Sequence, residues 1–164
     1  MAAKAEEAAA RWLARWTSLL AARASLPPAA PAVLTSEETL NYGRLAERVD
    51  SLAQALSELG LVPGDGLCMQ LPNCVEFLVT ILAASRIGAV TSTIHMPHGP
   101  SEAVAILRHS EAKLVLAPAD AAGRRLAEGL LEQASSLPRL DHVVTIGRDG
   151  PPGTLSFAEL AAGG

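Results

Sequence analysis

The sequence has few aromatic residues and no long apolar run. Aromatic side chains make up 3% of the 164 residues, so the core must be built mostly from aliphatic side chains. No apolar run reaches the roughly 18 residues that a membrane-spanning helix needs, and none resembles the apolar centre of a secretory signal. We therefore expect a cytoplasmic protein with no membrane partner.

Cysteine and clustered positive charge are also scarce. Cys68 and Cys74 are the only cysteines, and both stand in apolar surroundings, which predicts reduced core thiols rather than a disulfide or a nucleophile. The 13 Lys and Arg residues against 17 Asp and Glu residues give a formal net charge of −4, without a basic stripe. Because nucleic-acid phosphates are bound by clustered Lys and Arg, we expect no nucleic-acid partner.

What the sequence does contain predicts a folded domain. Apolar residues make up 49% of the chain and charged residues 18%, a composition that argues against disorder. Apolar residues at helical spacing predict a helix over residues 4–24, and Pro27, Pro28 and Pro31 predict a stiff connector after it. We therefore divide the chain into an N-terminal helix with its proline-rich connector, residues 1–30, and an α/β subdomain, residues 31–164.

Residues 31–164 alternate between short apolar runs and helical patterns. A small hairpin is predicted around residues 32–40, and then a helix capped by Asn41 and ended by Gly60. The predicted strands are 67–71, 89–94, 113–117 and 142–146. The predicted helices are 74–87 with Asn73 as cap, 102–110 with Ser101 as cap, and 121–136. Strands separated by single helices imply a doubly wound, mainly parallel sheet covered on both faces. A last helix opens after Ser156, and the chain looks interrupted there.

The loop after the second predicted strand carries the candidate functional side chains, His95, Met96 and His98. In an open α/β sheet this loop lies at the carboxyl end of its strand, where ligands bind. The histidines could line a substrate pocket, or stand in a solvated or interface loop. With His109 they could also hold zinc, although no carboxylate or cysteine is placed to complete the ligand set.

No motif in the sequence establishes a reaction. No G-x-G-x-x-G follows a strand, no G-x-x-x-x-G-K-[ST] loop is present, and no G-x-S-x-G nucleophile turn occurs. Asp120 and Glu102 suit helix N-termini, where negative charge is favoured. We therefore assign no catalytic, cofactor-binding or metal-ligating residue.

The order of several short motifs resembles the N-terminal portion of the AMP-forming acyl-CoA synthetase and adenylation-domain superfamily. The matching segments are PAVL (31–34), TLNYGRL (39–45), LGLVPGD (59–65), QLPN (70–73), EF (76–77), RIGAV (86–90) and RHSEAK (108–113). Asn41 stands where the family has Thr, Arg44 where it has Glu, and Glu111 where it has Gly. The loop at His95 is similar to that of members that activate cyclic, aryl or medium-chain carboxylic acids.

This resemblance implies a ligase reaction in which ATP and a carboxylic acid give an acyl-adenylate and then a thioester. It also implies ATP, magnesium and coenzyme A as the cofactors of the complete enzyme. The family's phosphate loop, magnesium-binding acidic residue, ribose-binding aspartate and catalytic lysine lie downstream of the matched segment. No residue of this chain can therefore receive those roles, and we expect no cofactor binding and no adenylation by this chain alone.

Three functional hypotheses follow. The chain is an N-terminal fragment or split subunit of an acid–thiol ligase, which needs a protein partner to supply the rest of the core or associates with itself through the exposed docking face. Alternatively, it is a non-catalytic remnant that acts as a protein-binding module. A third hypothesis is a complete small binding protein with its pocket at His95.

Overall fold

The computed structural model describes residues 27–121, 123, 125–147 and 150–162, so the helix predicted over residues 4–24 lies outside the described residues. The chain divides into two compact units at the step from Arg48 to Val49, inside helix α2 (Tyr42–Glu58). The two units are described separately. No helix in the described part of the chain is long and apolar enough to cross a membrane.

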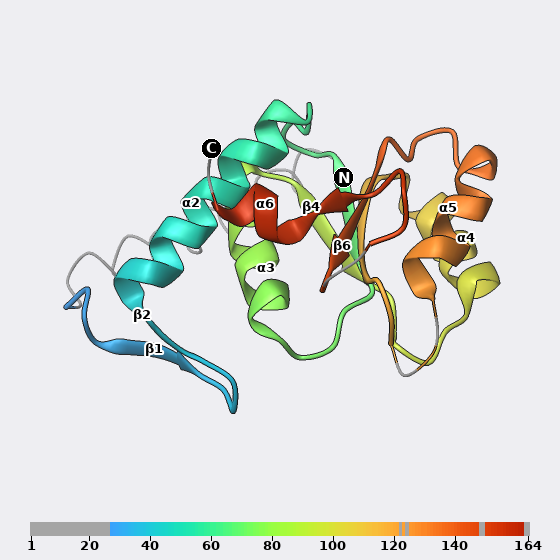
Figure 1. Ribbon diagram of the computed structural model, residues 1–164. Coiled ribbons are helices and arrows are strands. Elements are labelled where there is room, and N and C mark those ends of the chain that lie inside the picture. Colours follow the sequence, from blue (N-terminus) through green and yellow to red (C-terminus); the bar gives the residue numbers. More distant parts are fainter. Residues whose placement is uncertain (1–26, 122, 124, 148–149, 163–164) are drawn as a thin grey trace, which may run out of the picture. The chain divides into compact units, whose positions relative to one another are not determined.

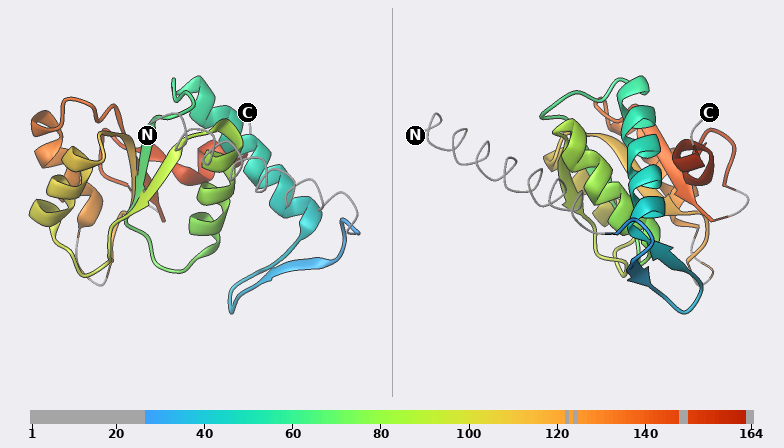
Figure 2. Two further views of the ribbon diagram at one scale, coloured as in Figure 1. Left: turned by 180° about the vertical axis from the view of Figure 1, so that it is seen from behind. Right: turned by 90° about the vertical axis from the view of Figure 1, so that its left-hand side faces the viewer.

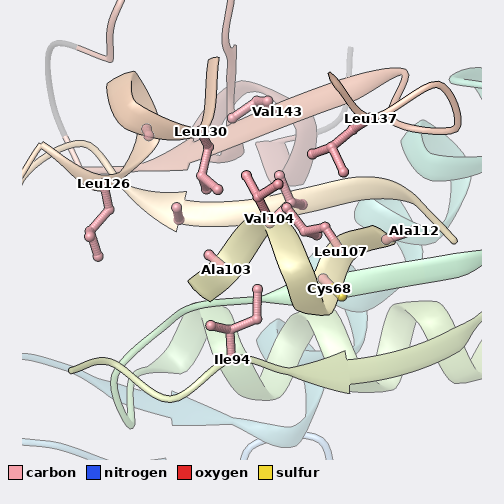
Figure 3. Packing of buried hydrophobic residues seen from close by; sticks show 13 residues of the cluster. Cys68, Ile94, Ala103, Val104, Leu107, Ala112, Leu126, Leu130, Leu137 and Val143 are labelled. Carbon is pink, nitrogen blue, oxygen red and sulfur yellow. The ribbon is translucent and has the colours of Figure 1, made fainter. Parts of the chain in front are cut away.

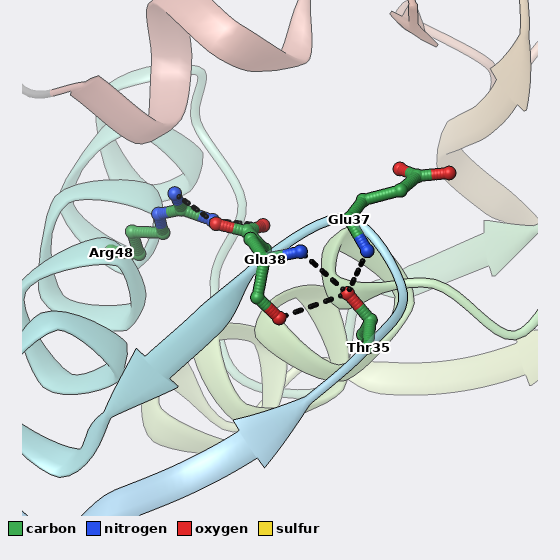
Figure 4. Close-up of polar contacts among 4 residues, drawn as sticks. All are labelled: Thr35, Glu37, Glu38 and Arg48. Carbon is green, nitrogen blue, oxygen red and sulfur yellow. Dashed lines mark hydrogen bonds and ion pairs between the residues drawn. The ribbon is translucent and has the colours of Figure 1, made fainter.

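The first unit contains the predicted hairpin. Strands β1 (Pro31–Leu34) and β2 (Thr39–Asn41) pair in the antiparallel sense. At the turn, the Thr35 hydroxyl accepts the N–H groups of Glu37 and Glu38 at 3.2 and 2.9 Å, as Figure 4 shows. The Glu38 carboxylate in turn accepts two hydrogen bonds from the Arg48 guanidinium at 3.0 and 2.9 Å. The polar turn thus fixes the hairpin register.

The proline-rich connector satisfies the first amide groups of α2. The carbonyls of Pro28 and Ala30 accept the N–H groups of Gly43 and Tyr42 at 2.9 and 3.0 Å. The Asn41 side chain accepts the N–H of Arg44 at 2.8 Å, which confirms Asn41 as the helix cap. Three of the four N-terminal amides that a helix leaves unpaired therefore have partners.

The second unit contains a five-stranded parallel sheet in the order β4-β3-β5-β6-β7. Its strands are β3 (Gly66–Met69), β4 (Val90–Thr93), β5 (Ala112–Pro118), β6 (His142–Ile146) and β7 (Leu155–Ser156). The four predicted strands are confirmed. The sequence analysis missed β7, because a strand of two residues has no periodicity that could reveal it.

Helices cover both faces of this sheet, which confirms the doubly wound α/β fold. The helices are α3 (Val75–Ile87), α4 (Pro100–His109), α5 (Leu126–Gln133), continued by the 3₁₀ turn Ala134–Ser136, and α6 (Phe157–Ala162). Helices α3 and α6 lie on one side of the sheet, and α4 and α5 lie on the other (Figure 1). Seen from behind, the strands still separate α3 from α4 and α5 (Figure 2).

Two of the predicted helix caps are wrong. Helix α3 begins after Cys74, so Asn73 does not cap it. Helix α4 already includes Ser101, and its first turn is closed by Glu102, whose carboxylate accepts the N–H of Gly99 at 2.8 Å. A side chain in the third helical position can reach back to the first amide, and here it replaces the expected serine.

Helix α5 also begins later than predicted, at Leu126 instead of residue 121. The Asp120 side chain accepts the N–H of Gly123 at 2.9 Å, and Gly123 has a φ of +78°. An aspartate that bonds to the backbone three residues on competes with helix formation, so these residues form a turn.

Apolar side chains are buried on both faces of the sheet, and one cluster lies between the sheet and helices α4 and α5. This cluster takes its residues from β3, β5, β6 and the two helices, together with Ile94 after β4 and Leu137 before β6, and it is drawn in Figure 3. Leu67, Cys68 and Met69 of β3 are all 0% exposed. Because β3 is buried on both faces, its sequence is a continuous apolar run instead of an alternating one.

Glu111 is strained at the turn between α4 and β5. Its φ is +49°, and it is the one non-glycine residue with positive φ among the described residues. The left-handed conformation costs about 1–2 kcal/mol for a residue with a Cβ atom, whereas glycine adopts it freely. The glycine that the family resemblance implies at this position therefore suits the backbone better than glutamate does.

We predict that Glu111→Gly raises the free energy of unfolding by about 1 kcal/mol, because it relieves the left-handed strain. Urea unfolding at neutral pH measures the change. Glu111→Ala is the matched control, since it removes the carboxylate and keeps the strain, so it should leave stability close to that of the wild type. A glycine variant less stable than the wild type would contradict this account.

A partly buried ion pair ties the residue before β3 to β5. The Asp65 carboxylate accepts a hydrogen bond from the Lys113 ammonium at 2.7 Å and one from the N–H of Val62 at 2.9 Å. The side chains of Asp65 and Lys113 are only 10% and 23% exposed. The hydrogen bond from Lys113, reinforced by the one from Val62, holds the pKa of the Asp65 carboxyl below its ordinary value of 3.8.

We predict that Asp65→Asn lowers the free energy of unfolding at pH 7 by about 1–2 kcal/mol, because Lys113 loses its charged partner. Folding lowers the pKa of Asp65, so its contribution is full above the unfolded-state pKa near about 4 and disappears as the pH falls through the folded-state value. Urea unfolding at several pH values should show that the wild type and Asp65→Asn differ less in free energy of unfolding as the pH falls.

The control is Asp50→Asn, which removes an exposed ion pair. The side chains of that pair, Arg86 and Asp50, are 51% and 49% exposed. Exposed pairs contribute little, so this variant should change stability by less than about 1 kcal/mol. If the free energies of unfolding of the wild type and Asp65→Asn differed more in acid than at neutral pH, the result would be incompatible with a lowered pKa of Asp65.

Candidate functional site

The strand order identifies where a ligand site should lie. The chain passes from β3 to its neighbour β4, and then crosses β3 to reach β5 on the other side. In open α/β sheets, ligands bind at the carboxyl ends of the strands where the strand order reverses in this way. The loops that follow β3, β4 and β5 therefore frame the candidate site.

Gln70 fixes the loop that follows β4. Its side chain is 0% exposed, and its amide nitrogen donates to the carbonyl of His98 at 2.8 Å and to that of His95 at 3.4 Å. The N–H of His98 also donates to the carbonyl of His95 at 3.0 Å and closes the turn. The loop is thus held against the end of β3 by a buried side chain.

The other amide atom of Gln70 has no partner. Its Oε1 is buried and accepts no hydrogen bond from any residue that the structure describes. A buried carbonyl oxygen without a donor is destabilising, so such groups mark positions where an ordered water molecule or a ligand is expected. The sequence analysis missed Gln70 because, in the sequence, it only continues the apolar run of β3; a polar residue at the end of a buried strand was the available signal.

An open recess of about 430 Å³ lies beside this loop, at the carboxyl ends of β3 and β4. Its wall is mainly apolar and includes Leu71, Phe77 and Met96, and His95 adds a polar group. The recess therefore brings together two of the three predicted residues, His95 and Met96. It combines an apolar surface with three hydrogen-bonding side chains, those of Asn73, Thr93 and His95, which is typical of sites for small organic ligands.

The histidines do not form one metal site. The rings of His95 and His98 meet edge to face with 6.0 Å between centroids, and His98 Nδ1 lies 3.5 Å from the Glu102 carboxylate. His109 lies at the other end of α4, about 15 Å along the helix axis, so it cannot join them. No group of three or more potential metal-ligating side chains occurs among the described residues.

The two cysteines are free thiols, and the prediction of a core position holds for Cys68 but not for Cys74, which is only partly buried. Cys68 is 0% exposed, and its sulfur lies 2.8 Å from the Ser92 hydroxyl and 3.3 Å from that of Ser110. Cys74 is partly buried at the start of α3, and burial raises the pKa of its thiol to about 11. A thiol with a raised pKa is a poor nucleophile at neutral pH, so Cys74 is not poised for covalent chemistry.

We predict that iodoacetamide modifies Cys74 slowly, because only the thiolate reacts. At pH 9 the rate should be roughly fiftyfold below that of an unfolded peptide of the same sequence, and it should keep rising beyond pH 10. Mass spectrometry of the modified peptide distinguishes Cys74 from Cys68. A Cys74 rate that levels off near pH 9, as it does for an exposed thiol, would contradict the raised pKa.

Comparisons with known proteins agree with this architecture. The family described as AMP-binding enzyme matches residues 20–162. The chain is 33% identical over 123 residues to the salicyl-AMP ligase / salicyl-S-ArCP synthetase of Mycobacterium tuberculosis. It is 36% identical over 125 residues to 4-coumarate–CoA ligase 5 of Oryza sativa subsp. japonica. These matches cover 75% and 76% of this chain, but only 21% of each relative.

A solved structure shows the same fold. The crystal structure of the anthranilate CoA ligase AuaEII in complex with anthranoyl-AMP superimposes with a TM-score of 0.80 at 20% sequence identity. The superposition covers 90% of this chain and 27% of that one. The described sheet and its helices thus correspond to the N-terminal part of the adenylate-forming core, and the chain spans about a fifth of the length of these two curated relatives.

Proposed function

Because this chain belongs to the AMP-binding enzyme family, we propose that it is the N-terminal scaffold of a carboxylic acid–thiol ligase and works only together with the rest of that core. The observation that supports this most directly is the match of residues 20–162 to the family, together with a superposition that covers only 27% of the anthranilate CoA ligase chain. Under this proposal the chain positions one side of the acid site and leaves nucleotide chemistry to other residues.

The residues at hand do not fit the nucleotide or its metal ion. The family uses ATP and magnesium. Adenylation requires fixed donors and a cation against the polyphosphate charge. The sequence contains no glycine-rich phosphate loop, and the described residues bring together no cluster of carboxylates that could hold magnesium. The nucleotide chemistry is therefore assigned to residues outside this chain.

We propose that the recess at His95 forms one wall of the acid-binding site. Its apolar lining, with Phe77 and Met96, suits a ring, and the His95 imidazole can donate a hydrogen bond to a carboxylate. Relatives named for salicyl and 4-coumarate groups support an aromatic acid as the substrate class, although other relatives of similar identity are acetyl-coenzyme A synthetases, so the apolar lining of the recess is what favours a ring. The recess is open on one side, so the remaining walls would come from the rest of the core.

Complementation tests the proposal. The chain is mixed with the remainder of a related aryl-acid ligase, a polypeptide that carries the phosphate loop, and pyrophosphate release is measured with ATP and an aromatic acid. We expect release that requires both polypeptides and saturates with the acid. Turnover by the purified chain alone would overturn the assignment of nucleotide chemistry to other residues.

Paired histidine variants localise the acid site. His95→Ala should lower kcat/KM for the acid in the complemented enzyme by about tenfold, mainly through KM, because it removes a hydrogen bond to the carboxylate. His109→Ala is the matched control, since His109 is exposed at the far end of α4, and it should change nothing. If the mixture shows no gain over the remainder alone, the non-catalytic protein-binding module becomes the better description.

A further inference from the structure

A second cavity lies at the opposite edge of the sheet, where the strands begin. It has a volume of about 190 Å³ and is enclosed by the turn from α4 to β5 and by the segment that precedes β6. The recess at His95 lies at the carboxyl ends of the strands, whereas this cavity lies at their amino ends. In this parallel sheet the two cavities therefore open at opposite ends of the strands. The second cavity is therefore separate from the proposed acid site.

The floor of this cavity is part of the hydrophobic core. Leu107, Ala112 and Leu137 line it, and their exposed fractions are 1%, 1% and 4%. Figure 3 shows the three residues at one end of the core cluster. An apolar cavity of about 150 Å³ inside a protein is large enough to bind benzene. The present cavity, at about 190 Å³, therefore has room for one six-membered ring.

The rim of the cavity is charged. Arg108, Arg139 and Glu111 line it, and all three are exposed. No ion pair or hydrogen bond engages the guanidinium of Arg108 or Arg139 within the described part of the chain. Arg139 does lie near enough to Asp65 to help lower the pKa of that carboxyl, but Asp65 is already paired with Lys113. Two cations against one carboxylate leave the rim net positive, which favours an anion.

Backbone strain at this rim is an independent observation. Glu111, the strained residue with a φ of +49°, lines the cavity. Strained residues concentrate at ligand sites, where the surrounding structure holds a side chain in place at a cost in stability. The Glu111 carboxylate is the one negative charge of the rim, so it opposes an anionic ligand there.

We propose that this cavity binds a small monocarboxylate that carries one aromatic or alicyclic ring. The ring lies against Leu107, Ala112 and Leu137, and the carboxylate faces Arg108 and Arg139. The ligand class is the same as that of the proposed substrate, but the site does not depend on the proposed function. It would make the chain responsive to an acid that is bound away from the reaction.

Titration of the complete chain with benzoate tests the proposal, with methyl-labelled Leu and Met observed by NMR. We expect saturable shifts of the methyl signals of Leu137 and Leu140, which line this cavity. Met96 reports separately on the recess at His95. Benzyl alcohol, which has the ring without the charge, should bind roughly tenfold more weakly, because it lacks a charge-assisted hydrogen bond.

Charge variants give effects of opposite sign. Arg139→Gln should weaken benzoate binding roughly tenfold, whereas Glu111→Gln should strengthen it several-fold, since it removes the one negative charge from the rim. Arg44→Gln removes an exposed arginine elsewhere and should leave the binding unchanged.

Three results would overturn the site. The first is a set of methyl shifts confined to Met96, which would support the proposed function alone. The second is equal affinity for benzyl alcohol and benzoate. The third is an equal effect of Arg139→Gln and Arg44→Gln on benzoate affinity.

Discussion

The burial of β3 and β5 on both faces is the constraint on which the rest of the structure depends. Leu67, Cys68 and Met69 expose no surface, and Leu114 and Val115 of β5 are also 0% exposed. A strand with no exposed face must pair along both edges and be covered by helices on both sides, since its backbone groups need partners and its side chains need apolar neighbours. The parallel order and the placement of α3, α4 and α5 follow from that requirement.

The same burial extends one residue beyond β3 and shapes the candidate site. Gln70 is as buried as the strand itself, so its amide must find partners inside the protein, and two carbonyls of the following loop supply them. The loop with His95 and His98 is therefore anchored to the core. This anchoring would give the proposed acid site a rigid wall.

The sequence predicted what depends on local pattern and missed what depends on tertiary contacts. Four strands, the Asn41 cap and the helix end before Gly60 were predictable, because apolar runs, a capping side chain and a left-handed glycine are local signals. The start of α4 was not, because Pro100 takes the first helical position and Glu102 bonds back to the N–H of Gly99, so Gly99 stands at the cap instead of Ser101. The two carbonyls that Gln70 contacts lie 25 and 28 residues away in sequence, so no short-range pattern could reveal that role.

Amide hydrogen exchange tests the central constraint most directly. Strands that are buried on both faces open only when the whole unit unfolds, so amides of β3 and β5 should exchange most slowly, with one common free energy of opening. Amides of β4, at the edge of the sheet with Val90 60% exposed, should exchange faster. Exchange of β3 as fast as that of β4 would contradict the account.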